Sequence, residues 1–581
     1  MKHLIIGIDF GTSTTVVKWK YEGQSWQYIQ PLNDPQIQNR TFIPSFVFYR
    51  KEPSERTFFG CAADQEILKP KSKGTSCRNF KMGLKYKMDS EKFKKIEPVI
   101  RDFFKFLYDQ IYNQILSPGD YDNLSIYVSV PAKWSEDSRD FMEKAFKEAG
   151  FENLNNNNRE VVIRIVDEPT AAIQCLLGRE AQDLMEQGIL RPGVKSNVML
   201  LDMGAGTSDI VMFQLLVADD GTGHVKLESI ENPHTFPQID NSYFCGGSEI
   251  DKKLKSYLHD KVIPLVGDLN EWDQICSLGI IKDWKESFLS HSLRIDGECQ
   301  NLPSSLNDIL NLKYGLNEFV ENFSISQNAF EEYTSNHWKN LNALINDAVK
   351  QYNEKYHVSA KDFDLILLTG GHSTWYCVDN LFNGKGVGVN GNIGKTNGFI
   401  KIQENPEQRI VKGNRPSETV SEGLCMQDIG VKIPQTSANN RYIEVMVGDK
   451  SSGIVNIVEN GESLPIEKTL ETEPIVVVNS VSNLHNFEVT LNIYEGSVAS
   501  KENGYTTKLR YSGENLLKDL FYLIFGGGKR NFSFNVVISA KIDEYQKLDI
   551  NGCLLVNGKP QKSFTLDDFQ RLSDKDSSEN S

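Results

Sequence analysis

One short element occurs twice in this chain and restricts the possible folds more than any other feature. The strings DFGTST at residues 9–14 and DMGAGT at residues 202–207 each follow an apolar run. In both strings an aspartate ends the run, a glycine-containing turn follows, and hydroxyl side chains come next. A repeat of this kind, far apart in the chain, indicates two related lobes that face each other. We therefore expect a duplicated domain with one such turn in each half.

The chemistry of the repeated element favours phosphate binding. A tight turn with glycine leaves backbone N–H groups exposed in a concavity that suits phosphate oxygens, and Thr12, Ser13 and Thr207 add uncharged donors. The carboxylates of Asp9 and Asp202 would repel phosphate unless Mg²⁺ and its waters lay between them. The alternative is a pair of ordinary β-turns that the aspartates cap. Two matched copies favour a magnesium-nucleotide site.

The first three quarters of the chain have the pattern of an α/β protein. Apolar runs of strand length alternate with longer stretches of helical periodicity from the N-terminus to about residue 430. The expected strands are Leu4–Ile8, Ser125–Val130, Val161–Val166, Asn197–Asp202 and Leu365–Thr369. The expected helices are Phe93–Leu116, Ser135–Ala149 and Phe330–Tyr356.

The pattern changes after residue 430. Residues 431–440 are polar, contain a proline and have no clear period, which is typical of a linker. Residues 441–560 contain short alternating runs separated by Gly and Asn turns, so we expect an antiparallel β-sandwich. Its expected strands are Tyr442–Val447, Ile454–Val458, Phe487–Tyr494, Thr507–Tyr511 and Phe532–Ile542. Residues 561–581 are expected to be a disordered tail with at most a short helix at Leu566–Leu572.

Composition excludes several classes of function. Hydrophobic residues make up 39% and charged residues 24% of the 581 residues, as in soluble globular proteins. The formal charge of −15 argues against nucleic-acid binding, which needs clustered Lys and Arg. No segment approaches the about 20 apolar residues needed to span a membrane, and none resembles a signal peptide. The nine cysteines form no closely spaced pairs, which argues against zinc and disulfides and favours a cytoplasmic location.

A glycine-rich stretch imitates two other nucleotide motifs. Residues 386–391 read GVGVNG, but they neither follow a clear strand nor open a helix, so a dinucleotide site is not expected. Residues 394–396 read GKT, but the first glycine of a P-loop is replaced by Val389. We interpret the stretch as a surface insertion.

Seven strings in the first zone together resemble the seventy-kilodalton heat-shock chaperones, within the superfamily of actin and the sugar kinases. They occur in the order found in that family and cover the whole zone. They are GIDFGTS (7–13), VPA (130–132) followed by residues 135–139, IVDEPTAA (165–172), DMGAGTSD (202–209), GGSEID (246–251), LLTGG (367–371) and RPSETVSEG (415–423). The resemblance implies an actin-like two-lobed ATPase with duplicated ribonuclease-H-like lobes. Lobe I would comprise about residues 1–195 and 408–430, and lobe II about residues 196–407.

The resemblance also implies catalytic roles. Asp9 and Asp202 would order the Mg²⁺ shell and the attacking water, and Glu168 would hold a metal-bound water. Lys81, in the string NFKMG (79–83), is similar to the family's catalytic lysine, whose charge suits a transition state that spreads negative charge over phosphate oxygens. The alternative for Lys81 is a surface lysine in a basic helix.

The implied nucleotide-binding set is larger. Its members are Gly11, Thr12, Ser13, Gly204, Ala205, Gly206, Thr207, Gly246, Gly247, Lys285, Gly370 and Gly371. Pro131 and Arg139 resemble a proline switch and its arginine partner, which relay nucleotide state to the next domain; alternatively they are a strand terminator and a helix N-terminal residue. His372 and Thr374 replace the Ser and Arg usual beside the adenosine motif, a departure that bears on base stacking.

The β-rich zone matches the family's peptide-binding sandwich more loosely, over about residues 460–556. The family's acidic, leucine-rich linker is absent, and no helical lid follows the sandwich. The expected function is a chaperone-like ATPase that uses ATP or ADP with Mg²⁺, and K⁺ as a further candidate ion. Its expected partners are extended apolar peptides, J-domain proteins and nucleotide-exchange factors, with no nucleic acid and no membrane. The alternatives are a β-domain for fixed partner docking, an ATP-dependent scaffold or filament, a small-molecule kinase, and an ATP-binding protein without hydrolysis.

Overall fold

In a computed structural model, the chain divides into two compact units: Met1–Asn232 with Ser242–Ile433, and Pro233–Asn241 with Pro434–Ser581. The expected linker lies outside the described residues except for Ser437 and Asn440, and so do residues 572–581. The structure describes residues 2–37, 40–67, 69, 71–86, 88, 90–132, 134–154, 160–219, 225–236, 245–267, 272, 280–413, 415–427, 437, 440–459, 462, 464–478, 486–496, 504–512, 531–543 and 547–571.

The first sheet contains the first copy of the repeated element. Its strand order is β3 (Gln30–Pro31), β2 (Thr14–Tyr21), β1 (His3–Phe10), β8 (Asn123–Val130) and β9 (Val161–Asp167), with β4 (Phe42–Pro44) also paired to β2. Strands β1, β8 and β9 are parallel to one another, whereas β1 and β2 form an antiparallel hairpin. Strand β1 is buried along almost its whole length, as expected for a central strand that is covered on both faces.

The second sheet repeats this arrangement. Its strand order is β12 (Val225–Phe236), β11 (Ser208–Asp219), β10 (Ser196–Met203), β15 (Leu365–Thr369) and β16 (Ile410–Lys412). Strands β10 and β11 form an antiparallel hairpin, and β10, β15 and β16 are parallel. The two sheets therefore share one topology, and each begins with the hairpin that carries the repeated motif. Because β16 pairs with β15, the chain leaves the second sheet only after Lys412, later than the expected boundary at 408.

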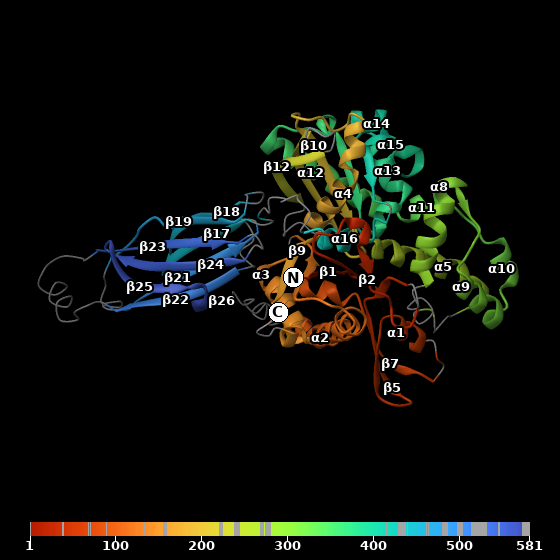
Figure 1. The fold of residues 1–581 in the computed structure, drawn as a ribbon, viewed down its shortest axis with the longest axis horizontal. Helices are drawn as coiled ribbons and strands as arrows, with labels where there is room; N and C mark the ends of the chain where they lie inside the picture. The colour runs from red at the N-terminus through yellow and green to blue at the C-terminus, as the bar shows by residue number, and fades with distance from the viewer. Residues whose placement is uncertain are drawn as a thin grey trace, which may run out of the picture. The chain divides into compact units, whose positions relative to one another are not determined.

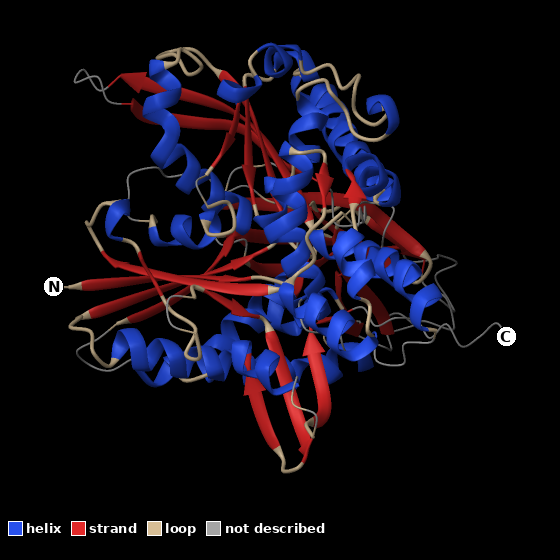
Figure 2. Cartoon of the chain, turned by 90° about the vertical axis from the view of Figure 1, so that its right-hand side faces the viewer, coloured by secondary structure: helices blue, strands red, loops and turns tan. Residues whose placement is uncertain are grey.

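A shared apolar core joins the two halves of this unit. Helices α4 (Glu168–Glu186) and α16 (Thr419–Cys425) contribute buried residues to the same cluster as strands β10, β11 and β15. Helix α16 also packs against β1, β2 and β8. The other helices that flank the sheets include α2 (Glu91–Ile111), α3 (Glu136–Glu148), α12 (Ser335–Tyr356), α13 (Tyr376–Phe382), α14 (Ile400–Glu404) and α15 (Pro406–Arg409), and Figure 2 shows helices on both sides of the strands.

Each half carries an insertion. In the first half, β6 (Arg56–Phe59), β5 (Phe46–Glu52) and β7 (Lys73–Arg78) form a small sheet with helix α1 (Gly60–Ile67), drawn as a projecting arm in Figure 1. The insertion in the second half is mainly helical. It comprises α5 (Gly247–Val266), α7 (Ile280–Asp283), the π-helix η5 (Trp284–Leu289), α8 (Ser290–Ile295), β13 (Glu298–Cys299), α9 (Ser304–Asp308), α10 (Asn317–Asn322), β14 (Ile325–Ser326) and α11 (Gln327–Tyr333).

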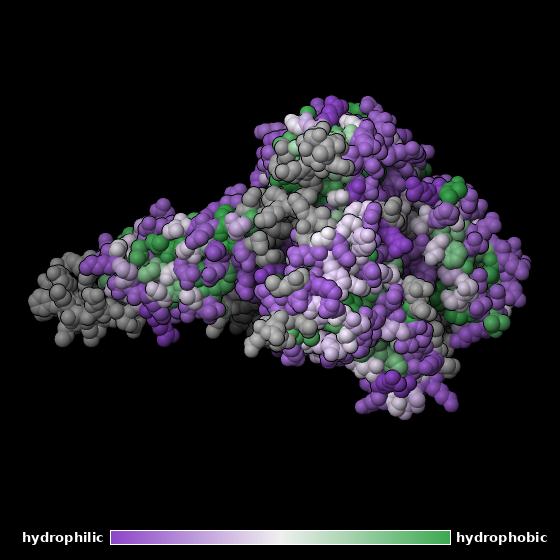
Figure 3. Space-filling view, viewed as in Figure 1, coloured by the Kyte–Doolittle hydropathy of each residue, from purple (hydrophilic) through white to green (hydrophobic). Residues whose placement is uncertain are grey.

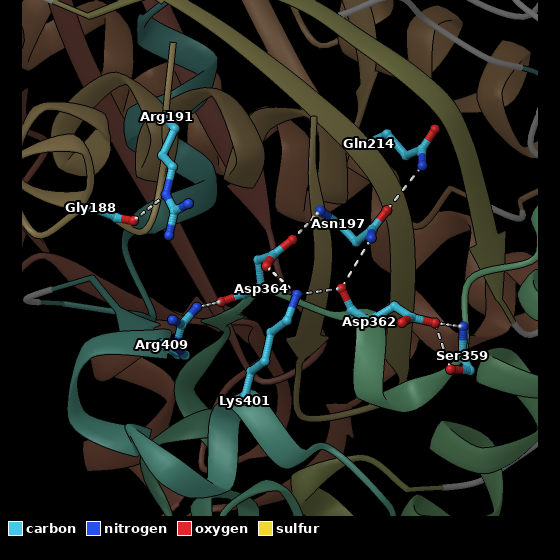
Figure 4. Close-up of polar contacts among 9 residues, drawn as sticks. All are labelled: Gly188, Arg191, Asn197, Gln214, Ser359, Asp362, Asp364, Lys401 and Arg409. Atoms are coloured by element: carbon cyan, nitrogen blue, oxygen red, sulfur yellow. Dashed lines mark hydrogen bonds and ion pairs between the residues drawn. The ribbon is translucent and has the colours of Figure 1, made fainter. Parts of the chain in front are cut away.

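A polar network fixes the start of the second sheet (Figure 4). The backbone N–H of Asn197 donates to Asp364 at 3.0 Å, and its side-chain amide donates to the carbonyl of Asp362 at 3.0 Å. Lys401 forms an ion pair with Asp364 at 2.7 Å, and Gln214 donates to the Asn197 side chain. These contacts tie β10, β11 and β15 together at the end of the sheet opposite Asp202. The polar groups in this network are hydrogen-bonded or ion-paired to one another, which fits a structural role.

The β-rich unit is built from two antiparallel sheets around one apolar core. The first sheet contains β18 (Lys450–Val458), β17 (Arg441–Val447), β21 (Asn486–Glu495), β22 (Gly504–Ser512) and β26 (Gln570–Arg571) in that order. In the second sheet, β19 (Ile466–Glu471) and β20 (Ile475–Val478) both pair with β23 (Asn531–Ile542), which is followed by β24 (Leu548–Val556) and β25 (Lys559–Thr565). The core side chains alternate along these strands.

Two expectations about boundaries are wrong. The tail expected from residue 561 is ordered as far as Arg571, because Phe564 is 2% exposed and Leu566 and Phe569 pack against the core. The expected helix Leu566–Leu572 is only a 3₁₀ turn, Leu566–Asp568, that precedes β26.

The helix expected at Phe330–Tyr356 is two helices, α11 and α12, which meet at Thr334. The Thr334 hydroxyl donates to the carbonyl of Phe330 at 2.6 Å and accepts from the Trp338 indole at 2.8 Å. These side-chain bonds stabilise the break.

Candidate functional site

The two repeated turns meet at the ends of β1 and β10. A methyl group added to Gly206 would lie 2.7 Å from the hydroxyl oxygen of Thr12 and 2.6 Å from the sulfur of Met82. The first turn closes with the Gly11 N–H donating to the Asp9 carbonyl at 3.1 Å. The motif of one half therefore contacts the motif of the other half.

Lys81 is buried beside these turns. It lies in the 3₁₀ helix η2 (Phe80–Lys85), and its residue is only 3% exposed, so the surface-lysine alternative is wrong. Its Nζ atom lies 2.6 Å from Oε1 of Glu168, the first residue of α4. The rings of Phe10 and Trp134 lie 5.7 and 5.4 Å from the same nitrogen, within range of a cation–π attraction. Lys81 is thus held in place by one carboxylate and two aromatic faces.

The carboxylates of Asp9 and Glu168 are buried close to this lysine. Burial raises the pKa of Asp9, while the charge of Lys81 and a 2.8 Å hydrogen bond from the Ser129 hydroxyl oppose the rise. Burial also raises the pKa of Glu168 to about 7, because the nearby Lys81 offsets only part of the desolvation and Asp9 adds repulsion.

Asp202 completes an excess of negative charge. Burial raises its pKa well above the usual range, and the neighbouring carboxylates Glu168, Asp209 and Asp9 raise it further. The carboxyl groups of Asp9, Glu168 and Asp202 thus act on one another in a buried region, and the charge of Lys81 lowers the pKa of each of the three. Within the described chain, no three His, Cys, Asp or Glu side chains are grouped closely enough to ligate a metal directly. Buried carboxylate oxygens of this kind fit a hydrated Mg²⁺ bound mainly through water.

The expected phosphate turn of the second half borders the motif turn. A methyl group added to Gly246 would lie 2.4 Å from the carbonyl oxygen of Ala205, so the position requires glycine. Gly247 begins α5, and its N–H donates to the carbonyl of Gly204 at 3.0 Å. The N-terminus of a 20-residue helix and two glycine turns are therefore brought together.

The glycines of the LLTGG string lie beside Asp202. Gly370 has a φ of +80°, and a methyl group there would lie 2.2 Å from the Met203 carbonyl oxygen and 2.8 Å from a carboxylate oxygen of Asp202. Gly371 opens a 3₁₀ turn, Gly371–Thr374. The adenosine-type motif therefore ends at the same place as the second acidic turn.

His372 occupies a buried position next to these glycines. Its Nε2 atom lies 3.0 Å from Nε2 of His337, and the ring of Trp338 stacks parallel to it. Burial lowers the pKa of His337 to about 3 and that of His372 well below its usual range, so both rings are neutral near pH 7. The departure from the family string therefore introduces a packed histidine pair. The exposed residues of the turn are Gly371 and Thr374.

Lys285 is not positioned as an exposed base-contacting residue. It is 4% exposed, forms a 2.6 Å ion pair with Asp251 and donates to the carbonyl of Gly247 at 3.2 Å. In this position it supports the start of α5.

Arg139 contacts the segment that contains Pro131. Its guanidinium donates to the carbonyls of Ala132 at 2.9 Å and Trp134 at 3.2 Å, and it forms an ion pair with Asp167. Asp167 immediately precedes Glu168. A continuous series of contacts thus joins the Pro131 segment to the Lys81–Glu168 pair.

The glycine-rich stretch at 386–396 binds a carboxylate of its own chain. The N–H of Gly388 donates to the buried Glu331 carboxylate at 2.5 Å, and a bridge joins Val387 to Ile393. Gly386 and Gly388 have φ values of +70° and +83°, which explains the glycines. The stretch folds around a structural acid.

Three residues near the site were not singled out from the sequence. Ser129 lies near the end of the expected strand Ser125–Val130. A serine in a buried apolar run indicates a polar partner, which here is Asp9. Asp209 follows the second motif directly and was read only as part of its string. Lys282, whose Nζ lies 3.3 Å from the Ser13 hydroxyl oxygen, comes from α7 in the other half and carries no local sequence signal.

Known proteins with a similar sequence are chaperones. The chain is similar to the chaperone protein DnaK. It is 22% identical to that of Thermosipho melanesiensis over 432 residues, 73% of this chain and 59% of the relative. It is 24% identical to that of Thermotoga maritima over 382 residues, 64% of this chain and 53% of the relative. It is 22% identical to that of Elusimicrobium minutum over 512 residues, 85% of this chain and 67% of the relative.

These matches support distant homology to the seventy-kilodalton heat-shock chaperones. The matches to the Thermosipho melanesiensis and Thermotoga maritima proteins span between half and three fifths of the length of these relatives. No family model matches the chain. Among the described residues, none of the helices has the length and apolar character needed to cross a membrane.

Proposed function

We propose that this protein is a chaperone-like ATPase of the actin-like fold. Mg-ATP would bind between the two halves of the α/β unit and be hydrolysed slowly, and hydrolysis would be coupled to the binding of extended apolar peptides by a sandwich-type β-rich unit. The observation that carries the proposal is the buried group of Asp9, Glu168 and Asp202 around Lys81, in which burial and mutual repulsion raise the pKa of Glu168 to about 7 and that of Asp202 well above its usual range. Such a group is stabilised when a divalent cation binds.

Each site residue has a role that its position supports. When bound, Mg²⁺ would supply positive charge that offsets the negative charge developing on the phosphate oxygens. Asp9 and Asp202 would accept hydrogen bonds from its waters, and Glu168 would orient one of these waters while it holds Lys81. The ammonium group of Lys81 would face the transferred phosphoryl group, where a fixed charge stabilises the transition state.

The nucleotide is proposed to lie on backbone N–H groups. Those of Gly11 to Ser13 and Gly204 to Thr207 would face the phosphates, and the N-terminus of α5 at Gly247 would add its dipole. Gly370 and Gly371 would adjoin the nucleoside, where Thr374 replaces a side chain that stacks on the base in the family. Arg139 and Pro131 are proposed to relay the state of the site through Asp167.

Peptide binding is the part of the proposal that concerns the β-rich unit. Ile454 in β18 and Val476 in β20 are 36% and 46% exposed, and Figure 3 shows apolar patches on the visible face of this unit. Extended peptides bind to such β-domains through backbone hydrogen bonds and apolar side-chain contacts. The proposed partners include J-domain and nucleotide-exchange proteins.

Two measurements on the full chain test the proposal. Phosphate release from Mg-ATP without any added acceptor is expected, and its absence in the presence of bound ATP would leave only a binding function. Binding of labelled apolar heptapeptides, measured by fluorescence anisotropy, is expected to differ several-fold between ATP and ADP. Hydrolysis with no peptide bound in either state, together with light scattering that rises on addition of Mg-ATP, would favour the scaffold alternative.

A further inference from the structure

Three lysines lie at the site, and the partners of their ammonium groups differ. Lys81 is paired with Glu168 and Lys285 with Asp251, each at 2.6 Å. Lys282 is different: in the described part of the chain its Nζ has no carboxylate oxygen within 4 Å, and it donates to the neutral hydroxyl of Ser13 at 3.3 Å. The Lys282 ammonium group therefore lies at the first phosphate turn without a described carboxylate in ion-pair contact, although its charge also acts on the adjacent Asp283.

Lys282 contacts the first phosphate turn from the opposite half of the α/β unit. It lies in helix α7 of the second half, whereas Ser13 follows the glycine turn of the first half. Its neighbour Asp283 is partly buried, and Arg40 and Asp64 of the first half are close enough to act on its charge. Polar groups of the two halves thus face each other beside the turn.

We infer that Lys282 is a second phosphate-binding cation, contributed by the half opposite the turn it serves. The inference rests on the proposed function. Its substrate class is a nucleotide whose phosphates lie on the Gly11–Ser13 turn, and binding would replace a neutral hydroxyl partner by an anionic one. A charge-assisted hydrogen bond is about twice as strong as a neutral one, so the nucleotide would hold the two halves together at Lys282.

Calorimetry on the full chain with Mg-ATP tests this inference. Lys282→Ala and Lys282→Gln are expected to weaken Mg-ATP binding by about tenfold or more, as for loss of a hydrogen bond to a charged group. Lys282→Arg is expected to stay within about threefold, because it keeps the charge. Lys350→Ala on exposed α12 removes the same charge from a side chain that is 75% exposed and is expected to leave affinity unchanged.

A second readout separates this role from a purely structural one. If Lys282 only tethers Ser13, the Gln variant should bind Mg-ATP as the unaltered chain does, because glutamine can donate to a hydroxyl. Thermal unfolding without nucleotide is expected to be the same for the unaltered chain and its four variants. Tight Mg-ATP binding by the unaltered chain with less than twofold weakening in both neutral variants would overturn the inference and leave the proposed function standing. No Mg-ATP binding by the unaltered chain would overturn both.

Discussion

Lys81 Nζ and Glu168 Oε1 lie 2.6 Å apart, with side chains that are only 4% and 12% exposed. The pair joins η2 to Glu168, the first residue of α4. Arg139 forms an ion pair with Asp167, which precedes Glu168 in the chain. Breaking a buried pair from one side leaves an uncompensated charge, which is more costly than losing the pair as a whole. Variants at either residue therefore need both a chemical and a structural readout.

Lys81→Ala is expected to abolish hydrolysis while ATP binding stays largely intact. Removing a preorganised charge from a phosphoryl-transfer site costs about 10² to 10³-fold in rate. Single-turnover phosphate release measures the rate, and calorimetry measures binding. Lys105→Ala, a surface lysine on α2, is the matched control. Unchanged hydrolysis in Lys81→Ala would remove the catalytic role proposed for Lys81.

The contribution of Glu168 to stability without ligand is expected to decrease as pH rises from about 4.5 to about 7, whereas the buried neutral rings of His337 and His372, whose pKa values are lowered from 6.5, contribute in the opposite direction. The pKa of Glu168 is raised to about 7 in the folded chain from an ordinary value near 4.5. The folded state therefore binds more protons than the unfolded state in this window, and this contribution is lost as pH rises through the folded pKa. Asp202 has a raised pKa and acts in the same direction.

Thermal unfolding of the unaltered chain and of Glu168→Gln at pH 5, 6, 7 and 8 checks this contribution, because Glu168→Gln is expected to lose the decrease that Glu168 causes. Mg²⁺ with nucleotide is expected to raise the melting temperature more at pH 8 than at pH 5, because it binds the deprotonated carboxylates. Glu66→Gln is the control, since the pKa of Glu66 is lowered to about 2 and the group does not titrate in this window. A slope that survives in Glu168→Gln would assign the dependence to other groups.

Local pattern was sufficient for several elements of the α/β unit. The expected strand Leu365–Thr369 is confirmed, and α3 lies between the expected ends, with Ser135 capping its start. Both are marked by signals within a few residues: an apolar run before a double glycine, and a serine whose hydroxyl accepts from the backbone N–H three residues later. Such signals need no knowledge of the rest of the chain.

The remaining features depend on contacts between distant residues. Strand β16 is three residues long and is defined only by its pairing with β15, and Phe564 is buried only because β25 pairs with β24. The His337–His372 pair joins residues 35 positions apart. Lys282 and Ser13 are separated by 269 positions. No local period indicates such partners, and their discovery required the fold.

Gly206→Ala is expected to weaken nucleotide binding by about tenfold with little effect on the fold. The added methyl group would lie 2.6 Å from Met82 Sδ and 2.7 Å from Thr12 Oγ1, so it displaces the Thr12 hydroxyl that is proposed to face the phosphates. Calorimetry with Mg-ATP measures the loss. Gly178→Ala makes the same chemical change in α4, away from the turns, and is expected to bind as the unaltered chain does. Equal affinities for the two variants would show that the turns need not touch for binding.

Gly423→Ala is expected to destabilise the α/β unit by about 1–3 kcal/mol, as overpacking of a core does. Its methyl group would lie 1.8 Å from the backbone carbonyl oxygen of Ala171, where α16 crosses α4, and backbone cannot move aside cheaply. Gly178→Ala again provides the contrast, because its methyl group meets only the flexible end of Met426 at 2.8 Å, and alanine favours the helix by about 1 kcal/mol. Chemical denaturation of both variants compares the two effects directly. Equal stability of Gly423→Ala and Gly178→Ala would mean that α16 and α4 cross at a wider distance than in the structure. Helix α16 would then be less firmly fixed to α4.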